Sequence, residues 1–318
     1  MSRRGSNRNR AKRDRVKGSV FGTPTDRSHA REPLPFTELP QQGLDMSDPK
    51  SVSSRNEIIL GHYRKEAEQE GVAGTSTMRD LTTRANEIEA IRSIVTYLTR
   101  QAKPVTNLLD LGCGNGYLLS LLSQEFPELD LEGLDYTPEL IDIARARGIE
   151  DCKIEQGDVR CLPFDDARWD MVVTERCIIN VMDRDEQAKS FSEVARILDT
   201  GGYYLCIEGF TDGLAELNEA RAELGLPPNV QPYHNLWFDK EWFLETIGRH
   251  FDVVDTEAAG EGLPPTNFLS SHYFISRALY PAVTRADIVY NTHLVRFFSF
   301  LPPMGCYSPI QLYLLRKR

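Results

Sequence analysis

The chain has 318 residues, of which 41% are hydrophobic and 26% are charged, and its formal net charge is −10 at pH 7. A chain of this length can bury one large core, or a core with a smaller cap. The acidic balance argues against broad nucleic-acid binding by the folded body. The sequence has no apolar run long enough to span a membrane and no signal peptide, so we expect a cytoplasmic protein.

The N-terminus is basic and departs from this average. The first twenty residues hold eight Arg or Lys side chains and one acid, Asp14. Residues 1–50 are polar, contain prolines and lack hydrophobic periodicity, so we predict a disordered basic tail. Such a tail could bind phosphate groups or an anionic membrane, act as a nuclear signal, or be a solubilising extension.

Residues 51–103 are predicted to be helical. The first half is polar and is broken by Gly71 and Gly74. In the second half, apolar side chains recur at the spacing of one helical face, namely Ile88, Ile91, Ile94, Val95 and Leu98.

The most informative stretch is TNLLDLGCGNG at residues 106–116. It contains a short apolar strand with the acid Asp110, then three alternating glycines, and a helix begins at Tyr117. Strand, glycine turn and helix predict the first unit of an α/β site whose ligand lies beyond the strand's carboxyl end. The third glycine comes one residue earlier than in a dinucleotide fingerprint. The acid before the turn favours a cationic ligand over a pyrophosphate.

Two further units follow the same pattern. Residues 129–135 form a strand that ends in Asp135, 19 residues after Gly116, close to the ~20 expected for an acid that accepts ribose hydroxyls. Tyr136 could pack against an adenine, and Thr137 is the predicted N-cap of the next helix. Residues 152–156 form a third strand, which Gly157, Asp158 and Val159 close, and residues 169–173 form a fourth.

The stretch DLGCGNG resembles motif I of the class I S-adenosylmethionine (SAM)-dependent methyltransferases, and the likeness extends over residues 104–257. It implies an α/β fold with a doubly wound, mostly parallel seven-strand sheet of order 3-2-1-4-5-7-6, in which strand seven is antiparallel. It also implies SAM as the cofactor, with the motif I acid near the methionine amino group. The residues that the resemblance assigns to SAM are Asp110, Gly112, Cys113, Gly114, Asn115, Gly116, Asp135, Tyr136, Asp158, Val159 and Thr174.

In methyltransferases of this type, a helical segment such as residues 51–103 often forms a lid over the cofactor. Tyr63 and Arg84 could then face SAM, with Arg84 pairing the cofactor's carboxylate, although surface roles suit both residues equally well. A closed lid would exclude water and strengthen electrostatic interactions at the reacting centre.

The acceptor side is predicted from the segment after strand four and from the connection 209–238, which is long enough to be a binding element. His234 is the best candidate for a general base, because its unperturbed pKa lies nearest neutrality, and Glu208 and Glu175 follow. The alternative for His234 is a histidine in a surface turn. The alternative for Glu175, Arg176 and Asn180 is a salt-bridged helix entry. The side chains predicted to bind the acceptor are Arg176, Asn180, Asn218, Arg221, Tyr233 and Asn235.

Residues 260–305 are predicted to be an insertion before the last strand, which we place at residues 310–315. The insertion contains His272 and Arg277, and a cap or a dimer contact would explain it equally well. The predicted organisation is a tail at 1–50, a helical segment at 51–103 and a methyltransferase domain at 104–318, with acceptor-facing elements at 209–238 and 260–305.

We therefore predict methyl transfer from SAM to an oxygen or nitrogen of a polar small molecule such as a sugar or a secondary metabolite. No metal is expected, because the six cysteines lack a C-x-x-C pair and neither Glu175 nor Glu208 has acidic neighbours in sequence. Two alternatives stay open. One is RNA or protein methylation guided by the basic tail, and the other is a catalytically silent SAM-binding partner protein.

Overall fold

A computed structural model describes residues 50–71, 78–259, 262–286, 288, 290–298 and 301–318. The basic tail predicted at residues 1–50 therefore lies outside the described residues, apart from its last position. None of the helices in the described ranges combines the length and the apolar composition that a bilayer crossing requires.

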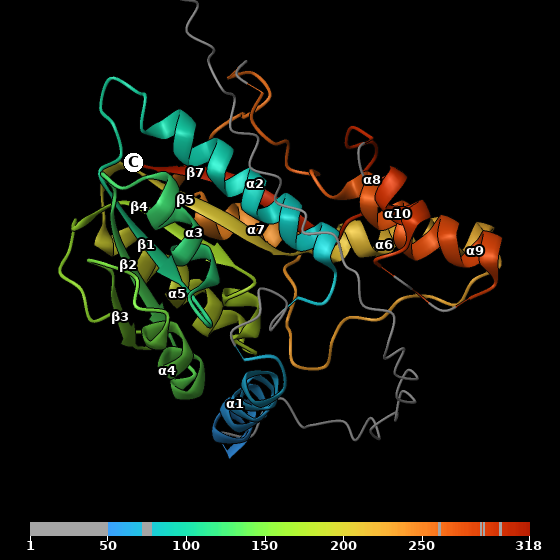
Figure 1. Ribbon diagram of the computed structural model, residues 1–318, viewed down its shortest axis with the longest axis horizontal. Coiled ribbons are helices and arrows are strands. Elements are labelled where there is room, and N and C mark those ends of the chain that lie inside the picture. The colour runs from blue at the N-terminus through green and yellow to red at the C-terminus, as the bar shows by residue number, and fades with distance from the viewer. Residues whose placement is uncertain (1–49, 72–77, 260–261, 287, 289, 299–300) are drawn as a thin grey trace, which may run out of the picture. The chain divides into compact units, whose positions relative to one another are not determined.

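One seven-stranded sheet organises the described chain (Figure 1). Its order is β3-β2-β1-β4-β5-β7-β6, and β7 runs antiparallel to both of its neighbours, as predicted. The strands are β1 (Asn107–Leu111), β2 (Asp130–Asp135), β3 (Lys153–Gln156), β4 (Trp169–Glu175), β5 (Leu198–Gly209), β6 (Phe251–Val253) and β7 (Ile310–Lys317).

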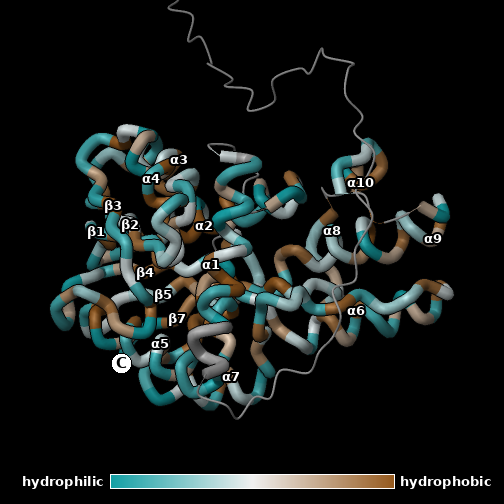
Figure 2. Tube along the Cα trace, turned by 90° about the horizontal axis from the view of Figure 1, so that it is seen from below, coloured by the Kyte–Doolittle hydropathy of each residue, from teal (hydrophilic) through white to brown (hydrophobic). Residues whose placement is uncertain are grey.

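Helices cover both faces of this sheet, because side chains alternate between the faces of each central strand. Leu108 of β1 belongs to the core that α2 and α3 cover, whereas Leu109 belongs to the core that α5 and α7 cover. Figure 2 shows the hydrophobic residues gathered along the strands. The covering helices are α2 (Leu81–Leu98), α3 (Tyr117–Glu125), α4 (Pro138–Ala146), α5 (Arg184–Ile197), α6 (Thr211–Glu223) and α7 (Lys240–Ile247).

The segment predicted to be helical at 51–103 forms two helices, α1 (Lys50–Glu70) and α2. Asp80 is the N-cap of α2, and its side chain accepts the backbone N–H groups of Thr82 and Thr83. The residues of α2 that face the sheet are the predicted apolar positions, which are buried from Ile91 to Leu98.

Two connections differ from simple loops. The first thirteen residues of the expected connection 211–238 form α6, because Leu217 and Arg221 are buried on one face of that segment. The insertion is largely helical and contains α8 (Ser270–Phe274), a π-helical turn η2 (Ile275–Leu279), α9 (Tyr280–Thr284) and α10 (His293–Phe298).

Candidate functional site

A cavity of about 1100 Å³, its open mouth included, lies at the carboxyl ends of β1, β2 and β4. This is the edge at which doubly wound sheets bind their ligands. Its wall is built from the glycine turn, the ends of these strands, residues 157–160 and side chains of α1 and α2.

The glycine turn is left-handed at all three of its glycines, with φ values of 80° at Gly112, 53° at Gly114 and 72° at Gly116. A Cβ atom at Gly112 would lie 2.8 Å from the Cβ of Cys177, so a side chain there would push into the loop after β4. A Cβ atom at Gly114 would meet nothing within 4 Å, because this glycine lines the open cavity. The turn therefore places Gly112 and Gly114 at the cavity wall, whereas Gly116 packs against Ala144 of α4 and does not line the cavity.

The two predicted acids lie together at the cavity. Asp110 is 2% exposed, and none of the described residues donates a hydrogen bond to its carboxylate. Burial, with the nearby charges of Glu175 and Asp135, raises the pKa of Asp110 to about 8. A buried carboxylate in this situation is stabilised by a cationic ligand.

Asp135 is held in place by backbone donors. Its Oδ2 accepts the N–H of Gly114 at 2.8 Å, and its Oδ1 accepts the N–H of Thr137 at 2.8 Å. Thr137 is the N-cap of α4 as predicted, but its side chain makes no capping hydrogen bond. A carboxylate has about four lone-pair sites, so each oxygen of Asp135 retains capacity for a ligand hydroxyl.

The third unit closes one end of the cavity, where Tyr136, Asp158 and Val159 all line the wall. The carboxylate of Asp158 forms an ion pair with Arg160, with a closest distance of 2.6 Å. The guanidinium of Arg160 lies over the Tyr136 ring at 5.9 Å from its centroid. Arg160 is therefore part of this wall, although the sequence did not single it out.

Thr174 was predicted to bind the cofactor, but it lies outside the cavity wall. It is fully buried, and its hydroxyl is 2.8 Å from that of Tyr204 on β5. The reason is strand alternation: Thr174 shares its face with Val172, which packs against α5 and α7.

Four charged side chains form a buried cluster at the end of β4. Glu175 pairs with both Arg84 and Arg176, and Arg176 also pairs with Glu87. Although burial opposes ionisation, Arg84 and Arg176 hold the pKa of Glu175 below its usual value. Burial raises the pKa of Glu87 to about 7. Arg84, Glu175 and Arg176 line the cavity, and Arg84 and Glu87 are one turn apart on α2.

Polar side chains continue from this cluster toward α1. The hydroxyl of Tyr63 on α1 accepts the Nδ2–H of Asn180 at 3.0 Å, and the Oδ1 of Asn180 accepts the Nδ2–H of Asn235 at 2.8 Å. Tyr63 and Asn180 line the cavity. Helix α1 also contributes Asn56 and Ile59 at helical spacing from Tyr63, and a search for i, i+3, i+7 positions would have found them.

His234 does not line the cavity. Its ring stacks on that of His62 from α1, with the centroids 3.8 Å apart, and lies edge-on to Tyr63 at 6.4 Å. Burial lowers the pKa of His234 to about 4, and the nearby His62 contributes. The Nδ1 atom of His234 is buried and has no hydrogen-bond partner among the described residues. The imidazole is therefore neutral at pH 7.

Glu208, a second candidate base, does not lie in the cavity either. It is fully buried, and its carboxylate accepts the backbone N–H groups of Cys177, Ile178 and Ile179 at 3.1, 3.0 and 3.3 Å. Burial raises the pKa of Glu208 to about 7, against these three donors. This arrangement anchors the turn η1 (Ile178–Asn180) and corrects the prediction of Glu208 as a candidate base at the acceptor site.

Four of the residues predicted to bind the acceptor do not line the cavity, namely Asn218, Arg221, Tyr233 and Asn235. Asn218 bonds the backbone of Asn229, and Arg221 donates to the carbonyl oxygens of Pro227 and Arg277. These contacts fold the connection back onto α6. Tyr233 is 62% exposed.

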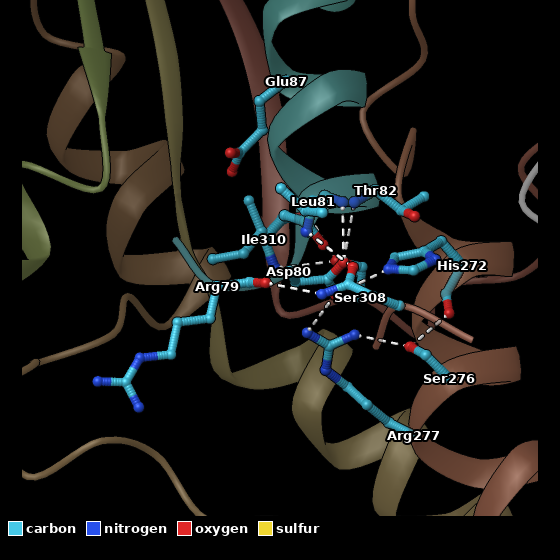
Figure 3. A network of polar contacts seen from close by, with 12 residues as sticks. Arg79, Asp80, Leu81, Thr82, Glu87, His272, Ser276, Arg277, Ser308 and Ile310 are labelled. Atoms are coloured by element: carbon cyan, nitrogen blue, oxygen red, sulfur yellow. Dashed lines mark hydrogen bonds and ion pairs between the residues drawn. The ribbon is translucent and has the colours of Figure 1, made fainter. Parts of the chain in front are cut away.

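The insertion anchors the start of α2 through one buried acid (Figure 3). The Oδ2 of Asp80 lies 2.8 Å from the Nε2 of His272 and 3.0 Å from a guanidinium nitrogen of Arg277. Although burial opposes ionisation, the hydrogen bond from His272 and the charge of Arg277 hold the pKa of Asp80 well below its usual range. The insertion therefore fixes the helix that carries Arg84 and Glu87.

Comparison with known proteins adds independent findings. Residues 108–202 match the family described as "Methyltransferase domain". A malonyl-[acyl-carrier protein] O-methyltransferase of Hahella chejuensis is 29% identical over 54% of this chain and 59% of its own length. A probable tRNA methyltransferase 9B of Bos taurus is 32% identical over 32% of this chain and 21% of its own. The chain thus spans less than two thirds of these curated relatives.

A solved structure shares the fold. The phosphoethanolamine N-methyltransferase 1 of Haemonchus contortus, in complex with phosphoethanolamine and S-adenosylhomocysteine, is similar with a TM-score of 0.52 at 14% identity, covering 84% of this chain and 49% of that one. The sheet order, the glycine turn and the matched domain agree with one another. Residues 108–202 therefore form a methyltransferase domain, and the fold and the matched relatives support a class I SAM-dependent methyltransferase with SAM as its cofactor.

Proposed function

We propose that the chain transfers a methyl group to an oxygen or nitrogen of a polar small molecule. The observation that carries the proposal is the cavity, in which two buried acids flank a glycine turn at the carboxyl ends of β1 and β2. The matched relatives support methyl transfer but differ in the acceptors that their names give.

The residues of the cavity fit SAM. Asp110 is a buried carboxylate that forms no ion pair with the described residues. The charge of Arg84 stabilises it only in part, and the α-ammonium of SAM would supply a direct positive partner. Asp135 would accept the two ribose hydroxyls. The open space at Gly114 would admit the cofactor's chain, and Tyr136 with Asp158 would hold the adenine.

SAM supplies a methyl group bonded to a positively charged sulfur, which makes that methyl electrophilic. The task of this chain is to orient the acceptor and to exclude water. Helix α1 is placed to exclude water, because Ile59 and Tyr63 line the cavity from this helix. Polar contacts hold it there, among them the ion pair of Arg64 with Glu139 of α4 and the hydrogen bond from Arg55 to the carbonyl of Met182.

A proton acceptor is required only for an acceptor group that must lose a proton. Glu175 is poorly suited, because two guanidinium groups already stabilise its charge. His234 does not line the cavity and its lowered pKa weakens it as a base, so we propose that it acts only through Tyr63, which lines the cavity beside its neutral imidazole. We expect His234→Ala to lower the turnover rate more than the affinity for SAM, and an unchanged rate would remove His234 from the reaction.

A polar small molecule suits the acceptor end of the cavity. Tyr63 and Asn180 offer a hydroxyl and an amide at the wall, and Asn235 bonds to Asn180 from behind. Neutral polar groups of this kind fix the orientation of a hydroxylated or amine-bearing ligand.

The direct test is to incubate the protein with methyl-labelled SAM and fractionated cell extract, and then to identify the labelled compound. We expect label in a small molecule, and the Gly114→Val variant should give none. Label in RNA or protein that disappears when residues 2–17 are deleted would favour the tail-guided alternative. Binding of SAM with no labelled acceptor in any extract would favour a silent partner protein.

A further inference from the structure

We propose that the part of the acceptor that enters the cavity carries no negative charge, and that Glu87 enforces this selection by neutralising Arg176. The inference rests on the proposed function, because it concerns the acceptor of the same cavity. It separates acceptors that react through a carboxylate from those that react through a hydroxyl or an amine.

The guanidinium groups at the cavity wall already have carboxylate partners. Arg84 and Arg176 both pair with Glu175, and Arg160 pairs with Asp158. An anionic acceptor would have to displace one of these buried or partly buried partners, and the displaced carboxylate would then lose its own counter-charge.

Arg176 lines the cavity beside Asn180, and its backbone carbonyl accepts the Nδ2–H of Asn180. Its φ of 54° lies in the left-handed region, which is uncommon for a residue with a side chain. Glu87 is fully buried and pairs with this guanidinium from the side of α2, so Arg176 is held between two carboxylates. A single arginine between two acids offers little attraction to a further anion.

The charges around the cavity reinforce this effect. Counting the wall and Glu87, five carboxylates stand against three guanidinium groups, a formal excess of two negative charges when all are ionised. With all of these acids ionised, the one net positive charge of SAM would leave the loaded cavity with one net negative charge. A neutral or cationic acceptor group meets no such repulsion. The groups counted are Asp110, Asp135, Asp158, Glu175, Glu87, Arg84, Arg160 and Arg176.

Glu87 is fixed in position rather than free to withdraw. Figure 3 shows it on α2, further along the helix than Asp80, where His272 and Arg277 hold the N-terminus of that helix. Because α2 is anchored at this end and buried along its apolar face, the backbone that carries Glu87 is held in position beside Arg176.

The first test measures thermal unfolding of the protein saturated with S-adenosylhomocysteine, in low-millimolar malonate or phosphate, against sodium chloride of equal ionic strength. We expect no rise of the unfolding midpoint in the natural protein. In Glu87→Gln, Arg176 loses one counter-charge, and we expect malonate and phosphate to raise the midpoint by about 2 °C or more. This rise should vanish when Arg176→Gln is added.

Glu89→Gln is the matched control, since Glu89 lies on the same helix and pairs with Arg92 at the surface. It should behave as the natural protein does, which separates specific binding from general salt effects. A rise in the natural protein equal to that in Glu87→Gln would overturn the proposal. An unchanged midpoint in a folded Glu87→Gln would overturn the role of Glu87.

The second test examines the labelled product from the extract experiment. Methyl esters of carboxylates are cleaved by mild base and release volatile labelled methanol, whereas methyl ethers and methylamines are stable. We expect base-stable label, and base-labile label would overturn the proposal. If no compound is labelled, or if Glu87→Gln does not fold, the first test on the natural protein decides: a rise of its unfolding midpoint in malonate or phosphate would overturn the proposal. Failure to bind S-adenosylhomocysteine would instead refute the proposed function itself.

Discussion

Asp110 should make the affinity for S-adenosylhomocysteine rise with pH, because its carboxyl group is buried in the cavity. In the protein without ligand, burial and the neighbouring acids raise the pKa of Asp110 to about 8, so the carboxyl is largely protonated at pH 7. The ammonium group of S-adenosylhomocysteine would stabilise the ionised form and lower this pKa in the complex. Binding below pH 8 should therefore release a proton, and affinity should rise with pH until it levels near pH 8.

The size of the effect follows from the same pKa. At pH 7, the cost of ionising a group of pKa about 8 weakens binding about tenfold, or by ~1.4 kcal/mol, relative to binding by the ionised protein. At pH 6, we expect the affinity to be lower by about another factor of ten. Titration calorimetry at several pH values, in two buffers of different ionisation enthalpy, measures both the affinity and the proton release. Asp110→Asn should bind more weakly and lose this pH dependence. A flat affinity between pH 6 and 8 in the natural protein would refute the reasoning.

Three substitutions test other parts of the cavity and its support. Asp135→Ala should weaken S-adenosylhomocysteine binding by about 1–3 kcal/mol through lost hydrogen bonds, and an unchanged calorimetric affinity would rule out its role at the ribose. Gly114→Val should abolish binding with a largely intact circular dichroism spectrum, because the open space at Gly114 would be filled; normal affinity would contradict this reading. Glu208→Ala should lower the free energy of unfolding by about 1–3 kcal/mol, since three backbone N–H groups lose their acceptor. An unchanged midpoint in denaturant would show that these bonds do not stabilise the turn.

The glycine turn and its two acids could be predicted from the sequence because their signals are local. Asp110 and Asp135 each end an apolar strand, and the ends of adjacent parallel strands meet at one edge of a sheet. The sheet order and the antiparallel β7 were both expected from the family likeness.

Side-chain direction at the strand ends was harder to predict. Glu208 and Thr174 lie at carboxyl ends, but each shares its face with neighbours that point toward α5 and α7, so neither reaches the cavity. Strict alternation along β4 and β5 would have placed both correctly. Glu175, one residue after Thr174, faces the opposite side and meets Arg84 of α2.

Contacts between distant segments left no local signal. The stacking of His234 on His62 joins residues 172 positions apart. The burial of Asp80 by the insertion joins residues nearly 200 positions apart. Both depend on how separate helices pack, which periodicity in one segment does not specify.

The central claim is that the cavity above β1 and β2 binds adenosine joined to a sulfur-bearing amino acid. The most direct measurement is the thermal unfolding midpoint of the full chain with and without S-adenosylhomocysteine. At about 100 times the dissociation constant, binding adds about 2.7 kcal/mol of stability, and we predict a rise of about 5–10 °C. An unchanged midpoint at saturating concentrations would contradict the account.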